Sequence, residues 1–137
     1  MTGSGRSSGR ERAGGLLSPS ARDGIRLFNE GLFFEAHAAL EGAWNAEERP
    51  VRVLYQGLLQ VAVACLHLER GRLHQASIML GRARPKLAPF VDRATDVDVH
   101  RLLRDVDLLE ARLGDLPAGE PPPDLAGSFQ IVIVGGR

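Results

Sequence analysis

The sequence predicts an all-α protein, an up-and-down helical bundle of about five helices with a disordered N-terminal tail and an extended C-terminal arm. Three observations predict this class. Apolar residues recur every three to four positions in several successive stretches, as they do on one face of a helix. Glycine, proline and short polar turns separate these stretches. The FQIVIV segment near the C-terminus is the exception, because it is apolar and β-branched without a helical period.

Composition and charge fit one globular domain. The chain has 137 residues, 44% of them hydrophobic, and its 17 basic and 17 acidic side chains balance, so nucleic acid is not an expected partner. The N-terminal stretch lacks the apolar core of a signal peptide, and no run approaches the roughly 20 apolar residues that span a bilayer. We therefore expect a cytoplasmic protein with no membrane partner. Cys65 is the only cysteine, and its apolar neighbours predict an unreactive buried thiol.

Three parts of the chain differ in composition. Residues 1–17 are rich in Gly, Ser and Arg and cannot offset their ordering entropy by burial, which predicts the disordered tail. Residues 18–116 carry the helical patterns and form the bundle domain. Residues 117–137 begin with PAGEPPPD, a stiff linker, and end in the extended arm. No internal repeat stands out, although two successive helical hairpins could mimic one.

The first two helices are expected on either side of Gly31. The Ser-Pro-Ser stretch at residues 18–20 offers a helix start, because proline is tolerated in the first turn, and Gly31 supplies the stop. The second helix runs from Leu32 to Asn45. One face of it carries residues at the spacing i, i+4, i+7 and i+11, namely Phe33, His37, Leu40 and Trp44.

The third helix should be central and antiparallel to the second. A polar turn over residues 47–50 joins the two, and residues 51–70 are apolar nearly all round, as in a helix that others enclose. Its β-branched valines would also suit a strand, but the length of the stretch favours a helix. Gly57 indicates a close helix approach, with Trp44 or Tyr55 as the expected neighbour.

Glycine and proline also delimit the last two helices. Gly71 ends the third helix, and the fourth begins at Leu73 and is expected to break or kink at Pro85. The fifth, over residues 99–113, should be capped by Thr95 or Asp96.

A polar cluster is expected where the second and third helices face each other. His37 and Glu41 are four residues apart, so they are neighbours on one helix face. Antiparallel pairing predicts that His37 meets Gln56 or Gln60, because a buried amide without a partner costs about 1 to 3 kcal/mol. Glu41 should lie near Tyr55 and Gln56. The polar residues of the third helix share one face: Arg52, Gln56, Gln60 and His67.

Three interpretations of this cluster stay open. It is a structural network that fixes helix register, or a pocket in which His37 is an acid/base and Glu41 orients it, or a metal site. The metal site has two ligands where zinc typically takes three from the protein, so we expect no metal, and no cofactor motif is present. The candidate catalytic residues are His37 and Glu41, and the candidate binding residues are Trp44, Tyr55, Gln56 and Gln60.

A basic segment follows the third helix, with Glu69 as its one acidic residue. No aromatic residues lie between its basic side chains to stack on bases, so a solvated helix face is the expected interpretation. Its basic members are Arg70, Arg72, Arg82, Arg84 and Lys86.

Two stretches, FNEGLFFEAHAALEGAW and LYQGLLQVAVACLHLERG, resemble the domain of unknown function 309 family. The likeness covers roughly residues 27–87 and implies a small all-α bundle with no established activity. Two residues depart from the family pattern: Ala38 stands where a second acid is common, and Arg72 where an asparagine is usual. By carry-over the signature positions are Glu35, His37, Glu41, Trp44, Gln56, Gly57, Gln60 and His67.

The sequence predicts a non-enzymatic binding or assembly module, because no catalytic constellation is complete. The alternative is an enzyme, or a small-ligand or metal-binding protein, with a His37/Glu41 pocket between the second and third helices. An all-α bundle offers the arm no sheet, so the arm must lie along its own helices or pair with a second chain, and either arrangement buries Phe129, Ile131 and Ile133. We therefore predict a homodimer to which the arm contributes, and an unidentified small ligand as a further partner.

Overall fold

The computed structural model describes residues 17–93, 95–115 and 131. Within these ranges it contains five α-helices, one 3-10 helix and no strand, which confirms the all-α prediction. The predicted tail up to residue 16, the linker, and the arm apart from Ile131 lie outside the described residues. The elements are α2 (Pro19–Asn29), α3 (Phe33–Ala46), α4 (Arg52–Glu69), α5 (Leu73–Leu87), η1 (Ala88–Phe90) and α6 (Val99–Gly114).

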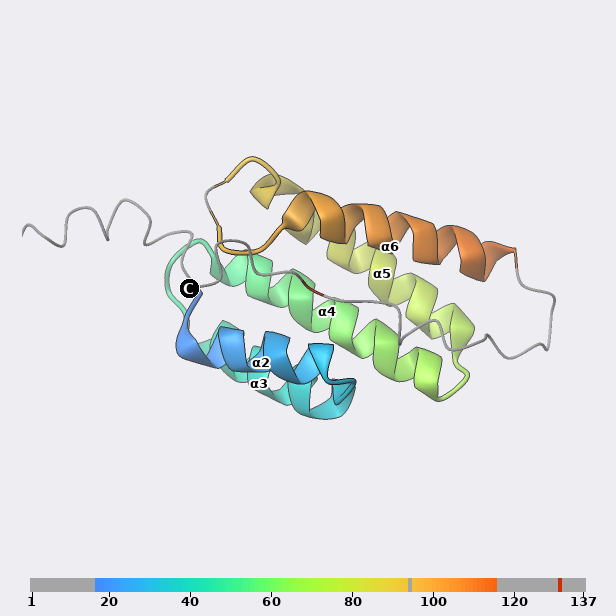
Figure 1. Cartoon of the computed structure of the whole chain (residues 1–137), viewed down its shortest axis with the longest axis horizontal. Helices are drawn as coiled ribbons and strands as arrows, with labels where there is room; N and C mark the ends of the chain where they lie inside the picture. The colour runs from blue at the N-terminus through green and yellow to red at the C-terminus, as the bar shows by residue number, and fades with distance from the viewer. Residues whose placement is uncertain (1–16, 94, 116–130, 132–137) are drawn as a thin grey trace, which may run out of the picture.

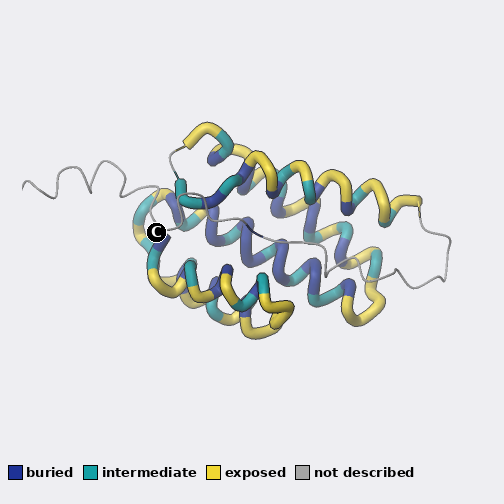
Figure 2. Tube along the Cα trace, in the orientation of Figure 1, coloured by how far each residue is buried: buried dark blue, intermediate teal, exposed yellow. Residues whose placement is uncertain are grey.

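Each helix packs on the helix before it and the helix after it. The main contacts join α2 to α3, α3 to α4, α4 to α5, and α5 to α6. In Figure 1 the central α4 lies between the α2–α3 pair and α6. Figure 2 shows it as a nearly continuous buried rod, and ten of its 18 residues are buried. The prediction of a central third helix is therefore confirmed.

The α2–α3 and α4–α5 hairpins are built alike. Gly31 and Gly71 end their helices with φ values of 84° and 73°, in the left-handed region that favours glycine. The N–H after each glycine bonds back to a carbonyl five residues earlier, Leu32 to Leu27 at 3.0 Å and Arg72 to His67 at 2.9 Å. Buried residues recur at the 40-residue spacing of these glycines, in the pairs Ala21 and Val61, Ile25 and Cys65, Phe28 and Leu68, Ala36 and Ala76, Leu40 and Leu80, and Ala43 and Ala83. The hairpins thus share a burial pattern and few residue identities, which is why no repeat stood out in the sequence.

Local signals place some helix ends correctly and others not. Ser18 caps α2 as predicted, because its Oγ accepts a hydrogen bond from the N–H of Ala21 at 3.1 Å. Pro85 does not break α5, which continues to Leu87 and then tightens into η1. Proline here removes only one helical hydrogen bond close to the helix end.

The cap of α6 is Asp98, and the prediction of Thr95 or Asp96 is wrong. The Asp98 Oδ1 accepts a hydrogen bond from the N–H of Arg101 at 3.1 Å. The other two side chains have different partners. Thr95 donates its hydroxyl to the Val97 carbonyl at 3.1 Å, and Asp96 forms an ion pair with Arg22 of α2.

Two glycines permit close helix approaches. A Cβ on Gly57 would lie 2.7 Å from Leu87 Cδ2, so the close neighbour belongs to α5, and the expectation of Trp44 or Tyr55 is wrong. A Cβ on Gly24 would lie 2.6 Å from Leu40 Cγ, where α2 crosses α3.

The core extends beyond the helices at both ends. Leu17, which the sequence assigned to the tail, is 7% exposed and joins the core. Ile131 of the arm is 1% exposed and packs in its own chain, whereas Phe129 and Ile133 lie outside the described residues. None of the helices in the described ranges combines the length and apolarity needed to cross a bilayer.

Candidate functional site

Most of the predicted site residues lie along one partly exposed strip of the bundle, which we call the polar seam. Four half-buried residues of α4 form its floor, with α3 on one side and α5 on the other. Its members are Arg52, Gln56, Gln60 and His67 of α4, His37, Glu41 and Trp44 of α3, and Lys86 of α5.

Trp44 and Arg52 fix the register of α3 against α4. The Arg52 guanidinium carbon lies 5.0 Å from the centroid of the Trp44 ring, and Arg52 Nη2 donates to the Trp44 carbonyl at 3.3 Å. From this pair, seven residues back along α3 lead to His37, and eight residues on along α4 lead to Gln60. The antiparallel register therefore places His37 and Gln60 at about the same level of the seam.

His37 and Glu41 are neighbours on the surface of α3, as the sequence predicted. His37 Nε2 lies 4.0 Å from Glu41 Oε1, and the two side chains are 29% and 51% exposed. That separation is too long for a hydrogen bond. The half-exposed Phe34 ring lies beside the imidazole, with 6.4 Å between centroids. His37 thus sits at the edge of the core and faces solvent.

Gln60 pairs with Lys86 instead of His37. Lys86 Nζ donates to Gln60 Oε1 and to the Arg82 carbonyl, both at 3.3 Å. In the described ranges Gln56 makes no side-chain hydrogen bond, so the predicted contact of His37 with a glutamine amide is not a hydrogen bond. Lys86 was not among the predicted site residues, although it is the only lysine in the chain.

Tyr55 lies in the core and not in the seam. Its side chain is fully buried, and its hydroxyl accepts a hydrogen bond from the N–H of Ser18 at 2.8 Å. This contact ties α4 to the start of α2. Tyr55 therefore positions helices, and it is separate from the exposed groups around Glu41.

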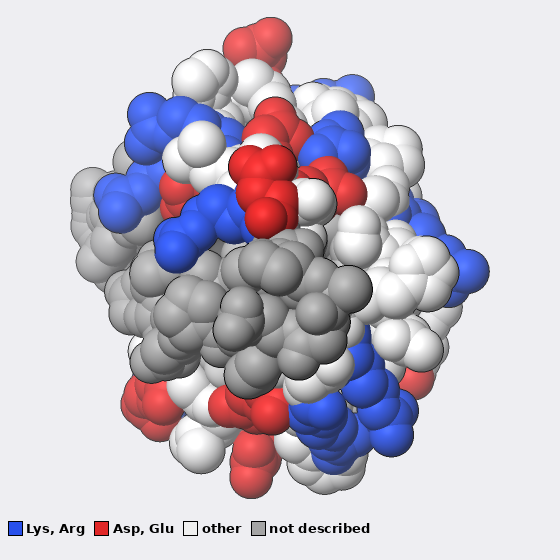
Figure 3. All heavy atoms as spheres, turned by 90° about the vertical axis from the view of Figure 1, so that its right-hand side faces the viewer, with Lys and Arg blue, Asp and Glu red and all other residues white. Residues whose placement is uncertain are grey.

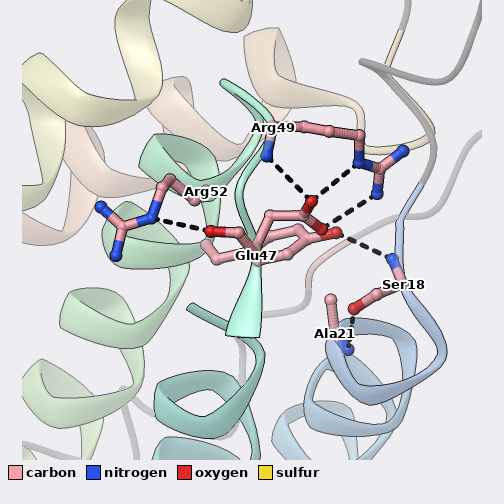
Figure 4. A network of polar contacts seen from close by, with 6 residues as sticks. Ser18, Ala21, Glu47, Arg49 and Arg52 are labelled. Atoms are coloured by element: carbon pink, nitrogen blue, oxygen red, sulfur yellow. Dashed lines mark hydrogen bonds and ion pairs between the residues drawn. The ribbon is translucent and has the colours of Figure 1, made fainter. Parts of the chain in front are cut away.

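Glu47 organises the turn between α3 and α4, and Figure 4 shows it between Arg49 and Arg52. Its carboxylate accepts hydrogen bonds from the Arg49 backbone N–H at 3.1 Å, from Nε at 2.8 Å and from Nη2 at 2.9 Å, while its carbonyl accepts from Arg52 Nε at 3.0 Å. These bonds from Arg49, with a smaller contribution from the Tyr55 hydroxyl, lower the pKa of Glu47 to about 2. The sequence showed the polar turn but not this network.

His67 lies at the far end of the seam, beyond reach of His37 along α4. Burial lowers the pKa of His67, and the positive charges of Arg72 and Arg70 lower it further. Its Nδ1 is buried without a hydrogen-bond partner. Among the described residues no three His, Cys, Asp or Glu side chains gather closely enough to hold a metal ion.

The basic segment divides between different roles. Arg84 forms ion pairs with Asp107 and Glu110 of α6, which raise the pKa of its guanidinium and join α5 to α6. Lys86 belongs to the seam. The remaining arginines are exposed and form no ion pair with any described residue: Arg70, Arg72 and Arg82. Basic and acidic side chains are interspersed on the end of the molecule that Figure 3 shows, as on a solvated face.

These features define an all-α protein made of stacked helical hairpins, with a partly exposed polar seam along its central helix. The family described as Domain of unknown function (DUF309) matches residues 21–79, so this region of the chain is similar to that family. No curated protein and no solved structure matches the chain significantly. The matched region contains the seam residues of α3 and α4, whereas Lys86 lies outside it.

Proposed function

We propose that this protein is a non-enzymatic binding module whose polar seam takes a small polar ligand. One observation carries the proposal: an imidazole, a carboxylate, two amides and an ammonium group from three helices line one partly exposed strip. These groups are His37, Glu41, Gln56, Gln60 and Lys86. A ligand that both donates and accepts hydrogen bonds would match this mixture of groups.

These side chains form few hydrogen bonds with one another, which favours a binding role over a purely structural network. A network that fixes helix register is expected to satisfy its own buried polar groups. Here the one hydrogen bond between seam side chains within the described residues joins Gln60 to Lys86, while His37 and Glu41 stay 4.0 Å apart and partly exposed. Their hydrogen-bonding capacity remains available to a ligand.

Fluorescence of Trp44, the only tryptophan, offers a direct test because the indole lies in the seam. A library of small polar metabolites is titrated against the full chain, and each hit is repeated with His37→Gln. We expect the substitution to weaken a hit at least about tenfold, the equivalent of roughly 1.4 kcal/mol, without changing the thermal unfolding midpoint. The matched control is His74→Gln, at an exposed position of α5.

A loss of stability without a loss of affinity would identify the His37 cluster as a structural network. If His37→Gln lowers stability and leaves the affinity of every hit unchanged, the seam does not bind these ligands through His37. Catalysis is the second candidate, favoured by the adjacency of His37 and Glu41. It requires that a hit be converted to product and that Glu41→Gln slow this conversion, with Glu35→Gln as the control on the same helix.

We further propose a cytoplasmic homodimer, as the balanced charge and the apolar arm suggest. Light scattering tests the dimer, since one chain weighs 14.8 kDa and a monomer mass refutes it. Because Ile131 packs within its own chain, we expect the dimer contact to involve other residues.

A further inference from the structure

Two hydrogen bonds with the Asn29 side chain form a clamp on Ile131, a residue near the C-terminus of the sequence. Asn29 Nδ2 donates to the carbonyl of Ile131 at 3.0 Å, and the N–H of Ile131 donates to Asn29 Oδ1 at 2.9 Å. One side-chain amide thus satisfies both backbone groups of a residue 102 positions away. The pattern reproduces one hydrogen-bonded pair of an antiparallel ladder, without a second strand.

The side chain of the clamped residue is anchored in the core. Ile131 is 1% exposed and joins the main apolar cluster. The short red segment at residue 131 runs across α4 in the view of Figure 1. The helix α2 packs mainly on α3 and shares at most a marginal contact with α4. Backbone hydrogen bonds combined with a pocket for a side chain are how proteins recognise extended peptides.

We propose that Asn29 and the apolar position filled by Ile131 form a binding site for an extended peptide with an aliphatic anchor residue, and that its resident ligand is the C-terminal segment of the same chain. The second hairpin has Glu69 at the position 40 residues after Asn29. A carboxylate lacks the N–H donor that the clamp needs, so the site belongs to the first hairpin. It is separate from the polar seam and independent of the seam's ligand.

The chain's own segment is the favoured occupant because it is tethered. Residues 116–130 link α6 to Ile131, and 15 residues can span up to about 50 Å, enough to cross a small domain. Covalent attachment raises the effective concentration of a ligand at its site, to the order of millimolar for a short linker that can span the distance. A peptide added in solution therefore competes poorly until the tethered segment is released.

The test uses the full chain with Ile131→Asp, which removes the anchor without truncation. A labelled synthetic peptide of residues 127–135 is titrated against this variant and against the wild type by fluorescence anisotropy. We expect the variant to bind the peptide and the wild type to bind it at least about tenfold more weakly. Adding Asn29→Ala to the variant should weaken binding at least about tenfold, whereas Asn45→Ala, at an exposed position of α3, should have no effect.

Hydrogen exchange gives a second readout that does not depend on the Ile131→Asp chain folding. In the wild type the Ile131 amide should exchange at least about tenfold more slowly than in the free peptide, and Asn29→Ala should abolish this protection while circular dichroism stays helical. Unprotected exchange of that amide in the wild type overturns the proposal. So does equal peptide binding with and without Asn29→Ala. A wild-type mass of twice 14.8 kDa that Asn29→Ala halves overturns the assignment to the same chain and places the segment on a second copy.

Discussion

Replacing Glu47 by Gln should destabilise the protein at neutral pH and remove one source of its acid sensitivity. The Glu47 side chain is 10% exposed and is held by Arg49. The folded-state pKa of Glu47 is about 2, against an ordinary value of 4.5. Because the folded pKa is depressed, its stabilisation is fully present above about pH 4.5 and is lost as the pH falls from there through about 2.

The size of the pKa shift sets the size of the expected loss of stability. A difference of about 2.5 pKa units, at about 1.4 kcal/mol per unit, sets an upper limit of about 3.5 kcal/mol. Arg49 is only two residues away and stays near Glu47 in the unfolded chain, which lowers the pKa there as well. We therefore expect about 2 kcal/mol, still a large fraction of the stability of a domain this size.

Urea unfolding followed by circular dichroism, repeated between pH 7 and pH 2.5, measures the contribution of Glu47 to the free energy of unfolding. The free energy of unfolding of Glu47→Gln should lie about 2 kcal/mol below the wild type at pH 7, and the two values should converge toward pH 2.5. Glu48→Gln is the control, because Glu48 is exposed and has no ion pair in the described part of the chain. A gap that stays constant over the whole range refutes the linkage, and so does a Glu48→Gln variant that behaves like Glu47→Gln.

Two further predictions concern the core. Gly24→Ala should destabilise by about 1 to 3 kcal/mol, because the new methyl group would meet the fully buried Leu40, and this outweighs a gain of up to about 1 kcal/mol in helix propensity. Gly42→Ala should stabilise by up to about 1 kcal/mol, because no described atom beyond its chain neighbours and the nearby backbone of its own helix lies within 4 Å of the new Cβ. Urea unfolding of both variants decides, and the close-approach argument is wrong if both substitutions shift the midpoint in the same direction. Cys65 is fully buried, which raises the pKa of its thiol, so a disulfide reagent at pH 8 should label it only as fast as the chain unfolds. Rapid labelling of the native chain would contradict that burial.

Local patterns in the sequence predicted the helices well because local physics determines them. The apolar period placed α3 and α4, and the Ser18 cap and the stops at Gly31 and Gly71 follow from side-chain capping and left-handed backbone. The central position of α4 followed from its nearly continuous apolar surface.

Features that depend on residues distant in the sequence could not be predicted from local patterns. Three residues before α6 are of types that can cap a helix, namely Thr95, Asp96 and Asp98. Asp96 instead forms an ion pair with Arg22 of α2, a residue 74 positions away. Lys86 reaches the seam from α5 only because Gly57 lets that helix approach. A local apolar period carries no information about such a contact between helices. The sequence therefore predicted the contributions of α3 and α4 to the seam but not that of α5.

The Glu47 network connects the seam to the helix that carries the peptide clamp. Glu47 fixes Arg52 through its carbonyl, and Arg52 covers Trp44 in the seam. The Tyr55 hydroxyl, which also contributes to the low pKa of Glu47, accepts the hydrogen bond of Ser18 at the start of α2. Because α2 is a single helix from Pro19 to Asn29, its N-terminal anchor and the clamp lie on one element. Protonation of Glu47 acts on the carboxylate that Arg49 holds, so its effect on Trp44 must pass through the Glu47 backbone and Arg52. Its effect on the clamp must pass through the packing of α2 on α3.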